Sequence, residues 1–144
     1  MIRNVRHTGI VTHDLERMAA FYRALGFVDE SHAIETGLFI EQVVHLDGVE
    51  VEWIKMRAPD GSLLELLQYH SHPLSLRSDL AKSNELGCSH LAFTVGDIDK
   101  ACEIVTNSGG RITNPPAIAP NGRVKVVYCH DPEGGLIELV EETH

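Results

Sequence analysis

The chain has 144 residues, of which 43% are hydrophobic, and this is enough for one compact domain or for two small modules that share a core. Its 12 basic and 21 acidic residues give a formal net charge of −9. The basic residues are scattered along the chain, whereas nucleic-acid binding requires a basic surface, so nucleic acid is excluded as the expected partner.

The sequence has no expected targeting or membrane-spanning segment. No stretch approaches the roughly 18 consecutive apolar residues of a membrane span, and the start, MIRNVRHTG, lacks the apolar core of a signal peptide. The three cysteines, Cys88, Cys102 and Cys129, show no C-x-x-C spacing and are expected to be free thiols. We therefore expect a cytoplasmic protein in a reducing compartment, with no membrane partner.

The first module, residues 1–69, is expected to contain a strand, a helix and three further strands. Residues 4–12 alternate in polarity, which places His7 and Gly9 on the same face of the first strand. Asp14 is a suitable N-cap for a helix that ends at Gly26, and residues 30–36 are polar and irregular. The three later strands are expected at Leu38–Leu46, Val49–Met56 and Ser62–Tyr69, with Asp47-Gly48 as a hairpin turn between the first two.

A linker, residues 70–87, has proline and serine early and a short helical pattern late, and it leads to the second module, residues 88–144. The order of elements then recurs. The expected elements are a strand at Cys88–Val95, a helix at Asp99–Ser108, a weak strand near Arg111–Thr113, a proline-rich loop at Asn114–Gly122, and strands at Arg123–Cys129 and Gly135–Glu141. The sequence therefore predicts an α+β fold in which two paired βαβββ modules form a curved, mixed and mostly antiparallel sheet within one domain, residues 1–144.

Two pairs of segments repeat within the chain. SHLAFTVGDID matches RHTGIVTHDLE, so that His90 is aligned with His7. DPEGGLIELV matches APDGSLLELL, so that Glu138 is aligned with Glu65. Each copy begins at a histidine and closes at a glutamate, which indicates an internal duplication.

Both glutamates lie in apolar runs, Leu-Leu-Glu-Leu-Leu and Leu-Ile-Glu-Leu-Val. A buried unpaired carboxylate costs several kcal/mol, so each needs a cation, a metal ion or water. Taken singly, each glutamate is explained by an outward position on a half-buried strand, and each histidine by a structural hydrogen bond. Their recurrence at equivalent places favours one His₂Glu₂ site for Zn²⁺, Ni²⁺, Co²⁺, Mn²⁺ or Fe²⁺, if the modules pair about a pseudo-twofold axis.

At these residues the sequence resembles the vicinal oxygen chelate superfamily, which includes glyoxalase I, methylmalonyl-CoA epimerase, extradiol dioxygenases and fosfomycin-resistance proteins. The resemblance rests on four segments in order: HTGIVTHDLERMAAFYRALGF, PDGSLLELLQY, SHLAFTVGDID and DPEGGLIELVE. It implies paired βαβββ modules around one divalent metal ion per site, a small-molecule substrate and a homodimer. By position it implies His7, Glu65, His90 and Glu138 as the metal ligands.

The resemblance also implies a reaction class. A His₂Glu₂ set is similar to that of glyoxalase I and related isomerases, which stabilise an enediolate or enolate on the metal while a carboxylate moves the proton. Glu138 is then the expected base, with Glu65 second. Glyoxalase I commonly has Asn shortly after its first-module Glu, whereas Gln68 and Tyr69 stand here, which argues against glutathione in the substrate.

Two other functions remain as alternatives. The first is an Fe²⁺-dependent extradiol-type dioxygenase that opens an aromatic ring, although such enzymes typically have His where Glu65 stands. The second is a non-catalytic binding protein of the bleomycin-resistance type, whose relatives generally lack the metal ligands. The sequence leaves open the substrate, the metal, and whether the site forms within one chain or between two.

Overall fold

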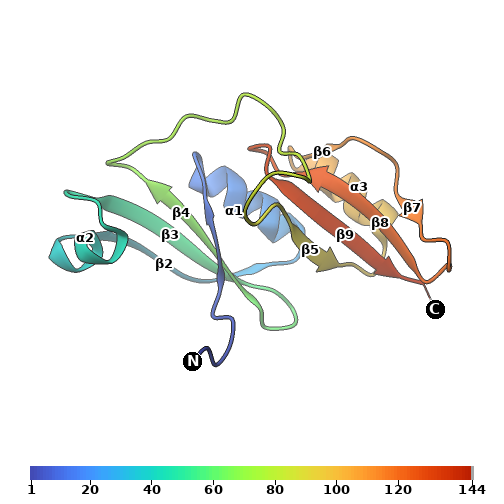
Figure 1. The fold of residues 1–144 in the computed structure, drawn as a ribbon, viewed down its shortest axis with the longest axis horizontal. Coiled ribbons are helices and arrows are strands. Elements are labelled where there is room, and N and C mark those ends of the chain that lie inside the picture. Colours follow the sequence, from blue (N-terminus) through green and yellow to red (C-terminus); the bar gives the residue numbers. More distant parts are fainter. Residues whose placement is uncertain (144) are drawn as a thin grey trace. The chain divides into compact units, whose positions relative to one another are not determined.

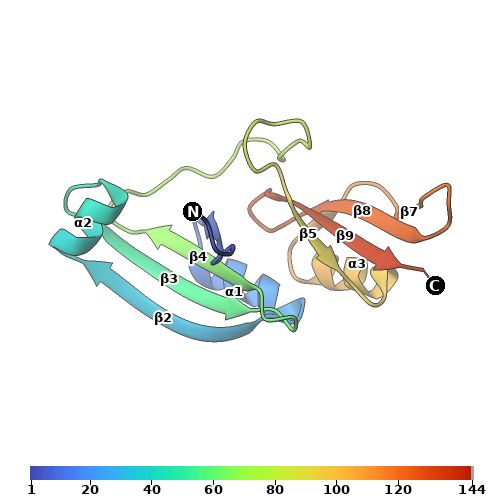
Figure 2. The ribbon, with the colours of Figure 1, turned by 60° about the horizontal axis from the view of Figure 1, so that its bottom comes forward.

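The computed structural model describes residues 1–143 and divides the chain into two compact units, Met1–Leu76 and Arg77–His144. Each unit contains a sheet with a helix on one face (Figures 1 and 2). The α+β class and the mixed parallel and antiparallel strands confirm the predicted fold class. That the two modules belong to one domain stays a prediction. Among the described residues, none of the helices has the length and apolar character of a membrane span.

The first unit has four strands and two helices. In chain order these are β1 (Thr8–Val11), α1 (Leu15–Ala24), β2 (Val28–Thr36), α2 (Leu38–Val44), β3 (Glu50–Arg57) and β4 (Leu63–Tyr69). The strand order in the sheet is β1-β4-β3-β2. β1 is parallel to β4, whereas the other neighbours are antiparallel. β2 is therefore an edge strand, paired on one side only.

Alternation along β4 separates the core of this unit from its open face. Leu64 and Leu66 are 3% and 0% exposed, and α1 packs on the same sheet with Met18, Phe21 and other apolar side chains fully buried. The helix begins after Asp14, whose carboxylate accepts a hydrogen bond from the backbone N–H of Arg17, as expected for an N-cap. Glu65 must then lie on the opposite face of the sheet from α1.

The second unit repeats this plan with a much shorter strand in place of β2. Its elements are β5 (Leu91–Thr94), α3 (Ile98–Asn107), β6 (Arg111–Ile112), β7 (Ala117–Ile118), β8 (Val124–His130) and β9 (Leu136–Glu142). The strand order is β5-β9-β8-β6, and β7 also pairs with β8. β5 is parallel to β9, as β1 is to β4. Ile137 and Leu139 are buried with the apolar side of α3, which leaves Glu138 on the other face.

One capping contact recurs in both units and supports the duplication. The Gln68 side chain at the end of β4 accepts a hydrogen bond of 2.9 Å from the backbone N–H of Leu15. The Glu141 carboxylate at the end of β9 accepts one of 2.7 Å from the backbone N–H of Ile98. The first N–H groups of a helix have no partner within the helix, so a side chain from the last strand satisfies one of them in each copy.

The predicted strand at Leu38–Leu46 is wrong, because α2 occupies this segment. Ile40 and Val44 are one helical turn apart and both pack on a cluster with Val49 and Val51. In a strand the two side chains would share a face but stand about 13 Å apart, too far to meet one small cluster. Asp47-Gly48 accordingly leads from a helix into β3 instead of forming a hairpin.

The second strand of the unit is β2, in the segment that was predicted to be irregular. Its side chains are mostly polar and exposed, which hides the alternation that identifies a strand. Backbone pairing with β3 nevertheless holds it in place, and charged side chains are common on edge strands because they prevent further pairing. The order βαβββ is thus retained, with α2 inserted between the second and third strands. The short helical pattern expected late in the linker does not form a helix in the described residues.

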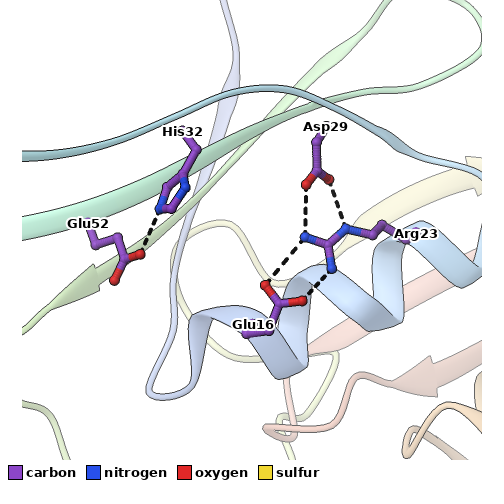
Figure 3. A network of polar contacts seen from close by, with 5 residues as sticks. All are labelled: Glu16, Arg23, Asp29, His32 and Glu52. Carbon is purple, nitrogen blue, oxygen red and sulfur yellow. Dashed lines mark hydrogen bonds and ion pairs between the residues drawn. The ribbon is translucent and has the colours of Figure 1, made fainter.

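Ion pairs fasten β2 to its neighbours (Figure 3). The Arg23 guanidinium on α1 lies between Glu16 and Asp29, with N···O distances of 2.6 and 2.8 Å. The guanidinium holds the pKa of the Asp29 carboxyl below its usual range. His32 of β2 contacts the Glu52 carboxylate of β3 at 2.6 Å. These contacts lie on exposed residues and stabilise the edge only modestly.

Candidate metal centre

The first predicted pair, His7 and Glu65, is brought together in the first unit. β1 runs parallel to β4 with Gly9 opposite Glu65, so His7, one residue before β1, points to the same face as the carboxylate. The His7 Nε2 atom lies 2.7 Å from Glu65 Oε2. Glu65 is only 9% exposed, and the imidazole is therefore a needed partner for a nearly buried carboxylate.

The second predicted pair, His90 and Glu138, is brought together in the same way in the second unit. β5 runs parallel to β9 with Ala92 opposite Glu138, and His90 again lies one residue before the strand. The His90 Nε2 atom lies 3.2 Å from Glu138 Oε2. The side chain of Ser89 contacts the other ring nitrogen, Nδ1, at 2.8 Å and so orients the imidazole.

The donor atoms of both pairs fit one side of a divalent cation site. Metal–ligand bonds from His nitrogen and carboxylate oxygen are near 2.1 Å, so neighbouring ligands of one ion are about 3 Å apart. The spacings of 2.7 and 3.2 Å are close to this distance. Within residues 1–143, no three His, Cys, Asp or Glu side chains form a metal-binding group. Each unit thus supplies two donors and not a complete site.

The two pairs differ in the residue across the sheet from each carboxylate. Lys55 of β3 is directly opposite Glu65, and its Nζ atom lies 4.0 Å from Glu65 Oε1. Tyr128 of β8 is directly opposite Glu138. The Tyr128 hydroxyl lies 3.3 Å from His90 Nε2, and the two rings meet edge to face with their centroids 5.0 Å apart. Burial and the nearby Glu138 carboxylate raise the pKa of the Tyr128 phenol.

Neither Lys55 nor Tyr128 is among the site residues predicted from the sequence. The signal was nevertheless present, because the alignment that sets Glu138 against Glu65 also sets Tyr128 against Lys55. The duplication therefore places a cation beside one carboxylate and a phenol beside the other. The two units therefore differ chemically at the position opposite the carboxylate.

A third histidine of the second unit, His130, is buried and does not belong to the proposed site. Its side chain is 6% exposed, and Nε2 lies 2.8 Å from the backbone carbonyl oxygen of Ala81. The imidazole therefore attaches the linker to β8 and takes no part in the His90–Glu138 pair.

A further cluster joins His32 and His70 through Glu52. The two Nε2 atoms lie 2.6 and 2.7 Å from different oxygens of the Glu52 carboxylate. Hydrogen bonds from His70 and His32 lower the pKa of the Glu52 carboxyl. Alternation along β3 places Glu52 with the buried Ile54, on the α1 side of the sheet. This cluster is therefore separate from His7 and Glu65.

A family model described as the Glyoxalase/Bleomycin resistance protein/Dioxygenase superfamily matches residues 4–139 of the chain. A glyoxalase family protein from Bacillus cereus has a solved structure that is 28% identical, with a TM-score of 0.91 over 100% of this chain and 97% of that one. Both findings extend over nearly the whole chain and include all four predicted ligands.

Two relatives show how far the likeness in sequence extends. A probable lactoylglutathione lyase of Vibrio cholerae is 33% identical over 64 residues, which is 44% of this chain and 45% of the relative. An uncharacterised protein of Bacillus subtilis is 27% identical over 99% of both chains. The chain thus spans less than half of the lyase that it matches, whereas the relative that it matches over the full length has no stated activity.

Proposed function

The chain belongs to the Glyoxalase/Bleomycin resistance protein/Dioxygenase superfamily, and on this basis we propose that it is a divalent-metal-dependent lyase or isomerase that removes a proton from a carbon next to a carbonyl. The observation that supports this proposal is the occurrence of one His–Glu pair at the same position in each unit. A single pair would be an ordinary structural contact. Two pairs at equivalent strand positions supply the four donors of one site.

The proposed ligands of one divalent cation are His7, Glu65, His90 and Glu138, contributed by the two units of one chain or of two chains. Imidazole nitrogen and carboxylate oxygen suit Zn²⁺, Ni²⁺, Co²⁺, Mn²⁺ and Fe²⁺. The bound cation would act as a Lewis acid that draws electron density from the substrate carbonyl.

Glu138 is the proposed base, and Glu65 is second. The Glu138 side chain is 20% exposed and 3.2 Å from its histidine, whereas that of Glu65 is 12% exposed, 2.7 Å from its histidine and next to the Lys55 ammonium. Glu138 is thus the more exposed of the two carboxylates and has no lysine opposite it across the sheet, so a substrate reaches Glu138 more readily than Glu65. The Tyr128 hydroxyl lies beside this pair and can hydrogen-bond to a substrate oxygen.

The position of Gln68 supports a substrate other than a glutathione conjugate. Its side-chain oxygen accepts the hydrogen bond from Leu15, on the α1 side of the sheet, and alternation places it on the face opposite Glu65. Gln68 therefore does not supply a polar contact to a substrate bound beside Glu65.

Metal content tests the proposal directly. The protein is purified without chelators or a His tag, and divalent metals are measured by elemental mass spectrometry in the wild type, His90→Ala and Glu138→Ala. His32→Ala is the matched control, because it removes a His–Glu contact outside the proposed ligands. We expect near-stoichiometric metal in the wild type and control and its loss in the other two variants.

The activity is then assayed with the metal-loaded protein. Proton abstraction is followed as exchange of substrate C–H for deuterium, with 2-oxo and 2-hydroxy acids, thioesters and the methylglyoxal–glutathione adduct as substrates. Loss of exchange in Glu138→Gln with metal retained is expected for the base. Absence of metal binding even after reconstitution would refute the proposal and favour a non-catalytic binding protein. Iron together with ring cleavage of catechols in air would refute it in favour of the dioxygenase.

A further inference from the structure

A polar hollow of about 520 Å³ opens in the first unit. The residues that line it include Arg6, Lys55 and Arg57, and Glu30 is the only acidic residue among the described residues that line it. Lys55 also contacts Glu65, so the hollow adjoins the carboxylate. All of these lining residues belong to the first unit.

The three cations in this hollow are not equally available. Each nitrogen of the Arg57 guanidinium already donates a hydrogen bond, two of them to the Glu30 carboxylate and one to the backbone carbonyl oxygen of Gly61. Arg6 makes no ion pair with any of the described residues. The Lys55 ammonium lies 4.4 Å from the centre of the Trp53 ring and 4.0 Å from Glu65, too far from the carboxylate for a hydrogen bond. Lys55 and Arg6 therefore retain hydrogen-bond donors for another group.

The duplication provides an internal comparison for these two cations. The position equivalent to Lys55 is Tyr128, and the position equivalent to Arg6 is Ser89. The second unit builds the same sheet and the same His–Glu pair without either cation. Neither cation is thus required by the fold or by the pair, and both are found in the first unit alone.

We propose that this hollow binds an anionic group of the substrate, a carboxylate or a phosphate, with Lys55 as the principal contact and Arg6 as the second. That the group belongs to a substrate rests on the proposed function. A lysine held against an aromatic ring is already partly desolvated and restricted, so its side chain loses less conformational entropy when it contacts an anion. An anionic group held there places the rest of a small molecule beside Glu65. The substrate class is therefore a carbonyl compound with a separate negative charge.

The test is a titration of the full chain followed by NMR of backbone amides, with inorganic phosphate, acetate and neutral acetamide as probes. We expect saturable shifts at Arg6, Lys55 and Ser62 with phosphate or acetate and none with acetamide. The stronger of the two anions identifies the group. Lys55→Gln should weaken binding about tenfold, as expected for loss of one charge-assisted contact, and Lys55→Arg should retain it.

Lys125→Gln is the matched control, because Lys125 lies on a central strand of the other unit and pairs with Asp99. It should bind the anions as the wild type does. His90→Ala is titrated in parallel: retained anion binding with lost metal separates this site from the proposed metal centre. Equal binding by Lys55→Gln and the wild type would overturn the proposal, as would equal shifts with acetamide or no saturable shift with either anion. Thermal unfolding of Lys55→Gln within a few degrees of the wild type establishes that the variant is folded.

Discussion

Removing His7 should destabilise the metal-free protein more than removing His90. In His7→Ala, the Glu65 carboxylate is 9% exposed and loses its partner at 2.7 Å, with only Lys55 remaining at 4.0 Å. A hydrogen bond to a charged group contributes about 1.5 to 3 kcal/mol, and exposed pairs contribute about 0 to 1 kcal/mol. The half-buried His7 pair lies between these cases, so we expect a loss of about 2 kcal/mol.

In His90→Ala the loss should be about 0.5 to 1 kcal/mol. The His90–Glu138 distance is longer, 3.2 Å, and the Glu138 side chain is 20% exposed, so water replaces part of the lost contact. Tyr128 also remains directly opposite Glu138 on the neighbouring strand.

Urea unfolding in the presence of a chelator measures both losses. Trp53 is the only tryptophan in the chain and lies in the first unit, so its fluorescence reports that unit, and circular dichroism reports both. In a His7→Ala background, Glu65→Gln should recover most of the loss, because a neutral amide costs less to bury than an unpaired carboxylate. Equal losses for the two histidine variants, or no recovery with Glu65→Gln, would contradict the pairing described for His7.

Three further outcomes are expected. Tyr128→Phe should retain metal, measured by elemental mass spectrometry, but its rate of deuterium exchange should be about tenfold lower or more, because the phenol lies beside the proposed base. An unchanged rate would exclude the Tyr128 hydroxyl from catalysis. Burial raises the pKa of the Asp131 carboxyl, so the wild type should lose stability relative to Asp131→Asn in thermal melts as the pH rises from the ordinary carboxyl pKa through the raised one. The asparagine keeps the acceptor oxygen for Glu133 and Gly135 but has no charge to bury. His70 and His32 lower the pKa of the Glu52 carboxyl. The stability advantage of the wild type over Glu52→Gln should therefore be present above the ordinary carboxyl pKa and be lost as the pH falls through the lowered one. Because the cluster is exposed, this advantage should reach at most about 1 kcal/mol. A pH-independent difference between these two proteins would contradict that assignment.

The parts of the fold predicted correctly are those with a clear local pattern. α1 follows from an N-cap aspartate and an apolar stripe, and β4 follows from an apolar run after a Pro-Asp-Gly turn. β2 and α2 were assigned wrongly because their patterns are misleading. The polar edge strand β2 has little alternation of polar and apolar residues. The apolar run of α2 suits a strand as well as a helix, and the packing of Ile40 and Val44 on one cluster is visible only in the structure.

Recurrence of one histidine and one glutamate predicted a shared His₂Glu₂ site, whereas the contact of His7 with Glu65 within the first unit follows from strand register. His7 and Glu65 stand near opposite ends of the first module in the sequence, and they meet because β1 pairs in parallel with β4. The prediction that all four residues bind one metal ion is a proposal that the metal analysis tests. The burial of His130 could not be predicted from the sequence, because its partner, the Ala81 carbonyl oxygen in the linker, is remote in sequence and lies in a segment with no recognisable pattern.

Three properties follow from the order of residues alone: the chain is a duplication, each copy begins with a histidine and ends with a glutamate, and one face of each core strand is apolar. Repeats and alternation are properties of the linear amino-acid sequence, and they can be recognised without knowing which strands are neighbours. The three-dimensional arrangement was needed to show that Lys55 lies opposite Glu65 and Tyr128 opposite Glu138, and that a hollow with two available cations adjoins the first pair. These contacts depend on the register between separate strands, which is fixed by packing and backbone pairing across the whole sheet.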